Sequence, residues 1–208
     1  MTQCSSSDYA AFPSTAYAEG LCEIDFVSCE IRPLWNNPRI GGPAFTVRLG
    51  PADNLMLHAA IYQAPAGSIL VVEAADARYA VAGGNVCAVA KARGIQGMII
   101  DGVIRDIEEI RQLEFPVYAR GLSPVPGRKE QFFPLAQPIT CGGALVRPND
   151  IVVADADGVV ILRRERYEEL RAIAQRRVNK EESECLDDWM QAHQAKINSI
   201  LNRFQLSD

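Results

Sequence analysis

The stretch that decides the fold runs from Ser68 to Arg120 and reads SILVVEAADARYAVAGGNVCAVAKARGIQGMIIDGVIRDIEEIRQLEFPVYAR. Apolar runs at 68–72, 97–101 and 116–120 predict strands, and the segments 86–93 and 106–113 predict helices. Strands that alternate with helices across short connections indicate parallel strands joined by crossovers. Because ligands gather at the carboxyl ends of such strands, we expect a functional site there.

Further strands are predicted around this unit, together with one more helix. The helix spans 54–63, and the strands span 44–49, 138–146, 151–154 and 158–162. The sequence Asp155-Ala156-Asp157-Gly158 is typical of a hairpin turn, since glycine accepts a positive φ. We therefore predict an α/β fold with a mixed sheet or a closed barrel. The predicted core domain is 1–163, and its first 40 residues are polar and irregular.

A charged, helical extension is predicted over 164–208. Eight of its residues fall on one face at helical spacing: Leu186, Trp189, Met190, His193, Ile197, Ile200, Leu201 and Phe204. An apolar stripe of this kind must pack on something. Docking on its own domain and packing on a neighbouring subunit both remain open.

Composition excludes several classes of protein. The chain has 208 residues, 48% hydrophobic and 23% charged, with a net charge of -5, which argues against a nucleic-acid partner. No apolar run approaches the roughly 18 residues needed to span a bilayer, so we expect no membrane association. The N-terminus has no signal-peptide pattern, and the six cysteines form no C-x-x-C pair. Free thiols in the cytoplasm are the expected state.

Lysine and histidine are scarce, and this limits the possible chemistry. A Schiff-base aldolase needs a desolvated lysine, and none of the four lysines lies on a predicted buried strand. The two histidines are too few for a histidine-built metal cage, and we expect both to be packing residues. These six residues are Lys91, Lys129, Lys180, Lys196, His58 and His193.

The segment Ala82-Gly83-Gly84-Asn85-Val86 enters a predicted helix directly from a loop. Two glycines let the backbone approach a ligand closely, and the first turn of a helix offers unpaired N–H groups to a carboxylate or phosphate. The alternative is a plain turn, for which a glycine pair is equally suited.

The pair Arg105-Asp106 stands where the next predicted helix begins. Arginine supplies a fork of donors for a carboxylate or enolate oxygen, and aspartate can hold a divalent cation. The alternative is structural: Asp106 caps its helix while Arg105 pairs with Glu108 or Glu109. Residue type and spacing leave both interpretations open.

Gly84, Arg105, Asp106 and Glu109 together resemble the signature G-x20-R-D-x2-[ED] of the RraA-like proteins, which include class II 4-hydroxy-4-methyl-2-oxoglutarate aldolases. The resemblance covers about residues 25–163. Supporting matches are Ile31-Arg32-Pro33-Leu34, Gly42-Pro43-Ala44-Phe45-Thr46-Val47, Asp53-Asn54-Leu55, Ile100-Asp101-Gly102, Pro116-Val117-Tyr118-Ala119-Arg120-Gly121 and Asp155-Ala156-Asp157-Gly158-Val159-Val160.

The resemblance implies a swivelling β/β/α fold and a carbon-carbon lyase that uses Mg²⁺ or Mn²⁺. By the family pattern, the amides of Gly83, Gly84, Asn85 and Val86 hold the carboxylate of pyruvate. Arg105 contacts the keto oxygen, and Asp106 is the metal ligand. The implied substrates are small 2-oxo acids, namely 4-hydroxy-4-methyl-2-oxoglutarate or a related 4-hydroxy-2-oxo acid, with oxaloacetate decarboxylation as a second activity.

The extension also distinguishes subgroups by resemblance. The aldolases carry a helical extension that supplies a glutamate to the neighbouring subunit's site, and Glu181 matches it best, although a solvated helix face is equally consistent. The implied assembly is a homotrimer or homohexamer. Many aldolases have an aspartate where this chain has Gly84. The alternative function is that of the RraA regulators, which bind ribonuclease E, and a demethylmenaquinone methyltransferase is disfavoured because no nucleoside-binding fingerprint is present.

Overall fold

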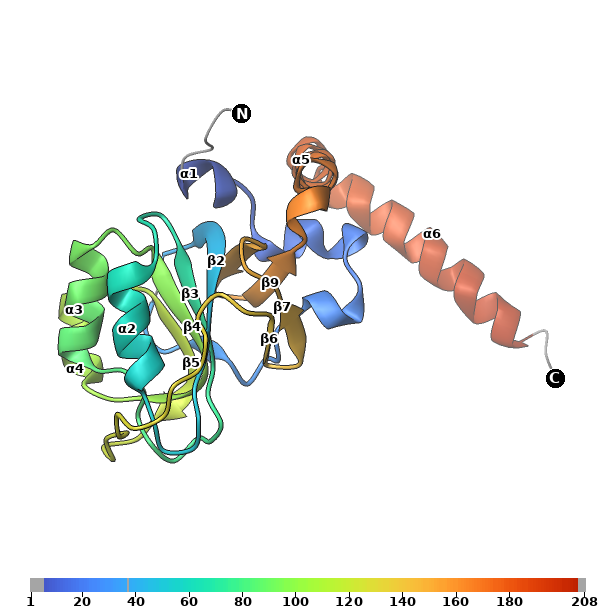
Figure 1. The fold of residues 1–208 in the computed structure, drawn as a ribbon. Helices are drawn as coiled ribbons and strands as arrows, with labels where there is room; N and C mark the ends of the chain where they lie inside the picture. Colours follow the sequence, from blue (N-terminus) through green and yellow to red (C-terminus); the bar gives the residue numbers. More distant parts are fainter. Residues whose placement is uncertain (1–5, 37, 206–208) are drawn as a thin grey trace.

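A curled, seven-stranded mixed sheet forms the centre of the computed structural model, which describes residues 6–36 and 38–205 (Figure 1). The strand order is β1-β5-β4-β3-β2-β8-β9, and the sheet nearly closes into a barrel. The strands are β1 (Arg32–Pro33), β2 (Ile40–Arg48), β3 (Ile69–Glu73), β4 (Gly97–Ile104), β5 (Val117–Leu122), β8 (Ile151–Asp155) and β9 (Gly158–Leu162). Cys4 and the last three residues of the predicted extension lie outside the described residues.

The predicted crossovers are confirmed. Strands β2, β3, β4 and β5 pair in parallel, and β1, β8 and β9 add antiparallel edges. The connecting helices α2 (Leu55–Gln63), α3 (Gly84–Ala92) and α4 (Ile107–Gln112) cover one face of the sheet (Figure 1). All three begin within two residues of their predicted starts. The carboxyl ends of β3 and β4 therefore lie next to each other, which positions the site.

The strands are apolar throughout because both faces of the sheet are buried. Leu70 and Ile100 pack in the cluster that includes the three helices, whereas Ile69, Val71 and Ile99 pack in a second cluster inside the barrel. All five side chains have no solvent exposure. Alternate residues thus serve different cores, which explains why these runs show no polar alternation.

The predicted single strand 138–146 is wrong, because it is two short strands. β6 (Ile139–Cys141) and β7 (Ala144–Val146) pair antiparallel across Gly142 and Gly143. These glycines have φ values of 54° and 82°, which favour a tight turn over an extended strand. The hairpin predicted between β8 and β9 is confirmed.

The N-terminal segment is more ordered than its composition suggested. It forms α1 (Ser6–Tyr9) and two 3-10 turns, η1 (Ser14–Gly20) and η2 (Glu23–Asp25). Tyr17 is fully buried in a third cluster, which also contains residues of β8, β9 and α5 (Tyr167–Ser183). The first helix of the extension is therefore packed on the core through buried aromatic and aliphatic side chains.

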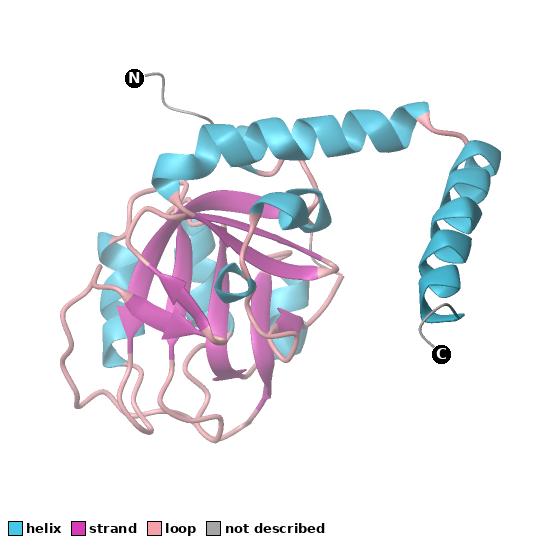
Figure 2. Cartoon of the chain, turned by 90° about the vertical axis from the view of Figure 1, so that its right-hand side faces the viewer, coloured by secondary structure: helices cyan, strands magenta, loops and turns pink. Residues whose placement is uncertain are grey.

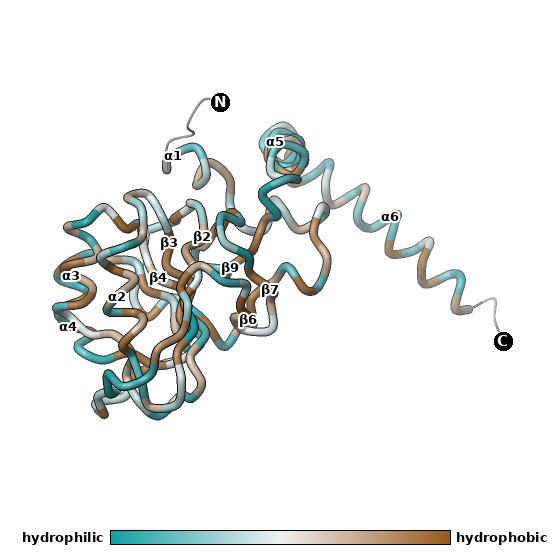
Figure 3. The backbone as a smooth tube through the Cα atoms, in the orientation of Figure 1, coloured by the Kyte–Doolittle hydropathy of each residue, from teal (hydrophilic) through white to brown (hydrophobic). Residues whose placement is uncertain are grey.

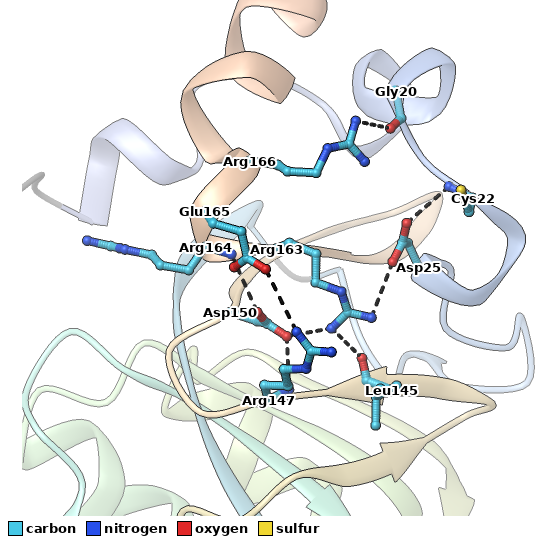
Figure 4. A network of polar contacts seen from close by, with 10 residues as sticks. All are labelled: Gly20, Cys22, Asp25, Leu145, Arg147, Asp150, Arg163, Arg164, Glu165 and Arg166. Carbon is cyan, nitrogen blue, oxygen red and sulfur yellow. Dashed lines mark hydrogen bonds and ion pairs between the residues drawn. The ribbon is translucent and has the colours of Figure 1, made fainter.

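A network of polar contacts joins the N-terminal segment to the start of the extension (Figure 4). Arg163, just before the 3-10 turn η3 (Arg164–Arg166), donates to Asp150 at 2.7 Å and to the Leu145 carbonyl at 2.9 Å, and it pairs with Asp25 at 3.4 Å. Arg166 donates to the Gly20 carbonyl at 3.2 Å. Both carboxylates are buried. The network fixes the point from which α5 departs.

The second helix of the extension, α6 (Leu186–Gln205), leaves the core (Figures 1 and 2). Every residue of α6 from Leu186 to Phe204 is exposed, and hydrophobic positions recur along its length (Figure 3). The predicted stripe is therefore not packed on its own domain, and packing on a neighbour remains a prediction. Among the described residues, no helix has the length and apolar character needed to cross a bilayer.

Candidate active site

A cleft of about 200 Å³ lies at the carboxyl ends of β3 and β4, where the sequence placed the site. Its floor is the segment after β3, which continues as an irregular strand beside β4. Val81 donates to the Val103 carbonyl at 3.0 Å, and Arg105 donates to the Ala82 carbonyl at 3.1 Å. The cleft is lined by Asn54, His58, Ala80, Val81, Ala82, Gly83, Asn85, Val86, Arg105, Asp106, Pro126, Gly127 and Lys129.

Two carboxylates approach the glycine pair closely. A Cβ at Gly83 would overlap Oδ2 of Asp106, and a Cβ at Gly84 would overlap Oε2 of Glu109. Gly84 is the first residue of α3, so its N–H belongs to the unpaired first turn of that helix. These positions thus bring a helix N-terminus close to acidic side chains, and the ligand-binding role of the loop stays a prediction.

Asp106 does not cap its own helix. It has a left-handed backbone conformation (φ 60°, ψ 41°) and makes no side-chain capping bond to α4. Its Oδ2 instead accepts a hydrogen bond from the Gly84 N–H at 3.2 Å and lies 3.3 Å from Nε of Arg105. Backbone strain of this kind is common at functional sites. The conformation aims the carboxylate into the cleft.

Arg105 pairs with Asp106 and not with the acids of the next turn. Glu108 is bound instead by Arg111 at 3.0 Å, so the helix-surface alternative for Arg105 is wrong. The side chains of Arg105 and Asp106 are 44% and 36% exposed, which leaves both able to meet a ligand. The structure brings together Gly83, Gly84 and this pair, as the spacing predicted.

Glu109 supplies a second carboxylate beside Asp106. Its side chain occupies the volume that any side chain at position 84 would need, and it lines an adjoining hollow with Gly84 and Asn85. The resemblance places an aspartate at position 84 in many aldolases of the family, and here a carboxylate from α4 occupies the space of such a side chain.

Sequence reasoning missed a second part of the cleft lining, formed by Asn54, His58 and Lys129. His58 was expected to be a packing residue, but it is only half-buried and faces the cleft. Burial lowers the pKa of His58, and the nearby Lys129 charge lowers it further. The match over Asp53-Asn54-Leu55 was the only signal for this part of the lining, since Lys129 arrives from a loop far along the chain.

Two further residues near the cleft have contacts of their own. The oxygens of Asp101 accept from Arg120 at 2.5 Å and from the Gly142 N–H at 2.7 Å. Cys87 is buried, and burial, with a smaller effect of the Asp106 charge, raises its pKa to about 12. A neutral thiol of this kind is not a nucleophile.

Glu181 lies on α5 and does not line the cleft of its own chain. Its carboxylate is 56% exposed and accepts from Arg177 at 2.5 Å, and Arg177 also pairs with Glu19. Its contribution to a neighbouring subunit's site stays a prediction.

The family model described as RraA-like, Aldolase/RraA, matches residues 21–161. The chain belongs to the RraA-like family. A relative from Halalkalibacterium halodurans, named "Putative 4-hydroxy-4-methyl-2-oxoglutarate aldolase", is 36% identical over 157 residues, which is 75% of each chain.

Solved structures of the family share the fold. Streptomyces coelicolor RraAS2, described as an unusual member of the RNase ES inhibitor RraA family, has a TM-score of 0.74 and 28% identity over 83% of this chain and 91% of its own. A Geobacillus kaustophilus protein, described as an S-adenosylmethionine:2-dimethylmenaquinone methyltransferase, has a TM-score of 0.60 and 33% identity over 67% and 88%. The proteins that resemble this chain thus carry names that describe more than one function.

The donors at and beside the cleft fit a hard divalent cation. Asp106 lines the cleft, and Glu109 lines the adjoining hollow with its carboxylate close to Gly84. Within the described residues, no cluster of three or more histidine, cysteine or acidic side chains has metal-binding geometry. One or two carboxylates, with water and substrate oxygens, are a set that magnesium accepts because it dehydrates reluctantly.

Proposed function

We propose that this protein is a divalent-metal-dependent lyase that cleaves a 4-hydroxy-2-oxo acid, such as 4-hydroxy-4-methyl-2-oxoglutarate, to pyruvate and a second oxo acid. Decarboxylation of oxaloacetate would use the same site. The observation that carries the proposal is the convergence of Arg105, Asp106 and the Gly84 N–H at one small cleft.

The unpaired amides at the start of α3 would hold the substrate's 1-carboxylate, because a helix N-terminus carries partial positive charge. The Gly84 N–H already donates to a carboxylate oxygen, that of Asp106, so the substrate carboxylate would have to replace Asp106 at this amide. Asn85 and Val86, which follow Gly84 in α3, line the same cleft. The substrate would thus be oriented with its 2-oxo group toward Arg105.

Arg105 would stabilise the oxygen on which negative charge develops. In the retro-aldol step the C3–C4 bond breaks, its electron pair moves to form the enolate of pyruvate, and the C4 hydroxyl loses its proton to become a carbonyl. Protonation at C3 then gives pyruvate. With oxaloacetate the same bond breaks and CO₂ leaves. A guanidinium positioned on the developing oxyanion lowers the barrier to both reactions.

Asp106, with Glu109 beside it, would hold the Mg²⁺ or Mn²⁺ ion. When bound, the ion would act as a Lewis acid for the substrate oxygens. The oxygen-only donor set supports these ions over zinc, which usually takes nitrogen and sulfur ligands.

Pyruvate release from oxaloacetate and from 4-hydroxy-4-methyl-2-oxoglutarate tests this function. Arg105→Ala should lower turnover by a factor of about 10² to 10³, the usual effect of losing an oxyanion donor. Arg111→Ala is the matched control, because Arg111 pairs only with Glu108 on the exposed face of α4. Full activity of the Arg105 variant, or activity that persists after chelation, contradicts the proposal.

A Schiff-base route must be tested separately, because Lys129 lines the cleft. Lys129 is exposed, and an exposed amine lacks the desolvation that activates such lysines. Borohydride treatment in the presence of pyruvate should therefore leave the protein mass unchanged. A stable adduct on Lys129 would show that the enzyme forms a Schiff base, and it would contradict the metal-dependent mechanism.

The assembly belongs to the same proposal. We expect a trimer or hexamer in which the apolar stripe of α6 is covered by a neighbour and Glu181 approaches the neighbour's cleft. Light scattering measures the assembly, and Glu181→Gln should slow turnover while Glu182→Gln, on the same exposed helix end, should not. Equal activity of both variants would remove Glu181 from the mechanism.

The second candidate function is regulation of a ribonuclease, and the likeness to the RNase ES inhibitor family favours it. Inhibition of ribonuclease E by the purified protein, with no pyruvate released from any oxo acid, would support this function over the lyase.

A further inference from the structure

The cleft lining includes three polar side chains that the proposed reaction does not use. Asn54 and His58 come from the start of α2, and Lys129 comes from the long loop after β5. All three line the same cleft as Arg105. The Lys129 ammonium, the Arg105 guanidinium, the His58 imidazole and the Asn54 amide therefore line one small volume.

Asn54 is buried but incompletely bonded. Only 6% of the residue is exposed, and its Oδ1 has no hydrogen-bond partner among the residues that the structure describes. It occupies the N-cap position of α2, where asparagine usually bonds to the first turn, yet its side chain makes no such bond. The unpartnered Oδ1 is an acceptor, so it calls for a hydrogen-bond donor and not for a carboxylate oxygen, whereas the Nδ2 group of the same side chain can donate to an anion.

The backbone around Lys129 is held in place on both sides. The Asn54 N–H donates to the Arg128 carbonyl at 2.8 Å, and the Glu130 N–H donates to Oδ2 of Asp53 at 2.6 Å. Asp53 is buried, with 2% exposure, and it also accepts from Gln131. A buried aspartate thus holds a distant loop so that the intervening lysine lies at the cleft.

The charges on the lining favour an anion at this part of the cleft. Asp106 is the one acidic residue that lines the cleft, and it is paired with Arg105 and the Gly84 N–H. The Lys129 ammonium therefore has no carboxylate partner on this lining. His58 is held toward its neutral form by burial and by Lys129, and a neutral imidazole still offers one N–H donor.

We propose that Lys129, Asn54 and His58 form a second anion subsite that binds the distal carboxylate of the substrate. This inference rests on the proposed function, and it makes these residues the determinants of specificity for 2-oxo acids with two carboxylates. The proximal carboxylate lies on the α3 amides, the distal carboxylate lies on Lys129, and the bond to be cleaved lies between them beside Arg105.

Binding of two unreactive 2-hydroxy acids, malate and lactate, tests the subsite without turnover. The two ligands differ in the second carboxylate, and calorimetry in the presence of Mg²⁺ gives both affinities. The wild-type protein should prefer malate by about tenfold or more, the usual value of one charge-assisted contact. Lys129→Met should abolish the preference by weakening malate alone. Lys91→Met, which removes the same charge outside the cleft lining, should retain it.

Asn54→Asp provides a second variant of nearly identical size, and its new negative charge should weaken malate and leave lactate unchanged. Equal affinity of the wild-type protein for the two acids, or an unchanged preference in both variants, would overturn the subsite.

Kinetics separates this inference from the proposed function. Lys129→Met should raise KM for oxaloacetate about tenfold. The exchange of pyruvate methyl protons with deuterated solvent, followed by NMR, should be unaffected because pyruvate has no distal carboxylate. A preference for malate without any pyruvate chemistry would retain the subsite and refute the lyase. Normal pyruvate chemistry with KM for oxaloacetate unchanged in Lys129→Met would refute the subsite and retain the lyase.

Discussion

Replacing Arg163 by methionine should be one of the most damaging single changes to the fold. The side chain of Arg163 is 13% exposed, and its partners Asp25 and Asp150 are 7% and 3% exposed. The variant would leave both carboxylates buried without a cation (Figure 4). Removing one partner of a buried pair costs about 3–5 kcal/mol. At about 2–4 °C per kcal/mol for a chain of this size, the melting temperature should fall by roughly 6–20 °C.

Urea and thermal unfolding at equal protein concentration measure this loss. Arg147→Met is the matched control, because Arg147 lies 3.8 Å from Glu165 and both side chains are more than half exposed. Such a pair contributes about 0–1 kcal/mol. A double variant, Arg163→Met with Asp150→Asn, should lose less than the sum of the two single losses because the residues share one contact. A loss of less than about 1 kcal/mol for Arg163→Met would refute the reasoning.

Three shorter predictions concern single residues. Tyr17→Phe should stabilise the protein by about 1 kcal/mol near neutral pH, because the hydroxyl is buried without a partner among the described residues. Burial raises the pKa of Tyr17 from 10 to about 12, which favours the neutral phenol in the folded state. The wild-type protein should therefore lose stability as pH rises from 10 toward 12, and Tyr17→Phe should lack this part of the loss in alkaline unfolding curves. Gly84→Ala should slow pyruvate release by about tenfold or more by displacing Glu109, whereas Gly121→Ala, with open space around its Cβ, should not. Cys87, whose pKa is about 12, should react with Ellman's reagent only after denaturation, and rapid labelling in the folded protein would contradict its burial.

The sequence predicted the parallel unit well because its signals are local. The runs at 68–72 and 97–101 lie in strands with both faces buried, Gly67 precedes the first run, and Gly102 follows the second. The prediction for 138–146 was wrong because no local signal marks the turn. Gly142 and Gly143 interrupt an otherwise strand-like run, and only their positive φ values in the structure show that the chain reverses there.

The two parts of the cleft lining differed in how far they could be predicted. Gly84, Arg105 and Asp106 come from consecutive elements, so their meeting follows from the crossover. His58 and Lys129 meet because the buried carboxylate of Asp53 binds the backbone of a loop more than 70 residues away. No periodicity in either segment encodes that contact. The argument from lysine scarcity was also too broad. It disfavoured a lysine on a buried strand, but it did not consider an exposed lysine such as Lys129, which lines the cleft.

The long spacing of the signature follows from the geometry of one crossover. Gly84 begins α3, and the chain then forms that helix, a turn and all of β4 before it returns to the same edge of the sheet at Arg105. The left-handed conformation of Asp106 turns its carboxylate back to the Gly84 N–H, and one helical turn later Glu109 reaches the space above Gly84. The residues at positions 84 and 109 therefore depend on each other, because the Glu109 carboxylate occupies the space that a side chain at position 84 would need. Gly84→Asp combined with Glu109→Ala should restore part of the activity lost in Gly84→Asp alone, because the carboxylate would return to the same space from the other side. Failure of the double variant to exceed the single one would separate the two positions.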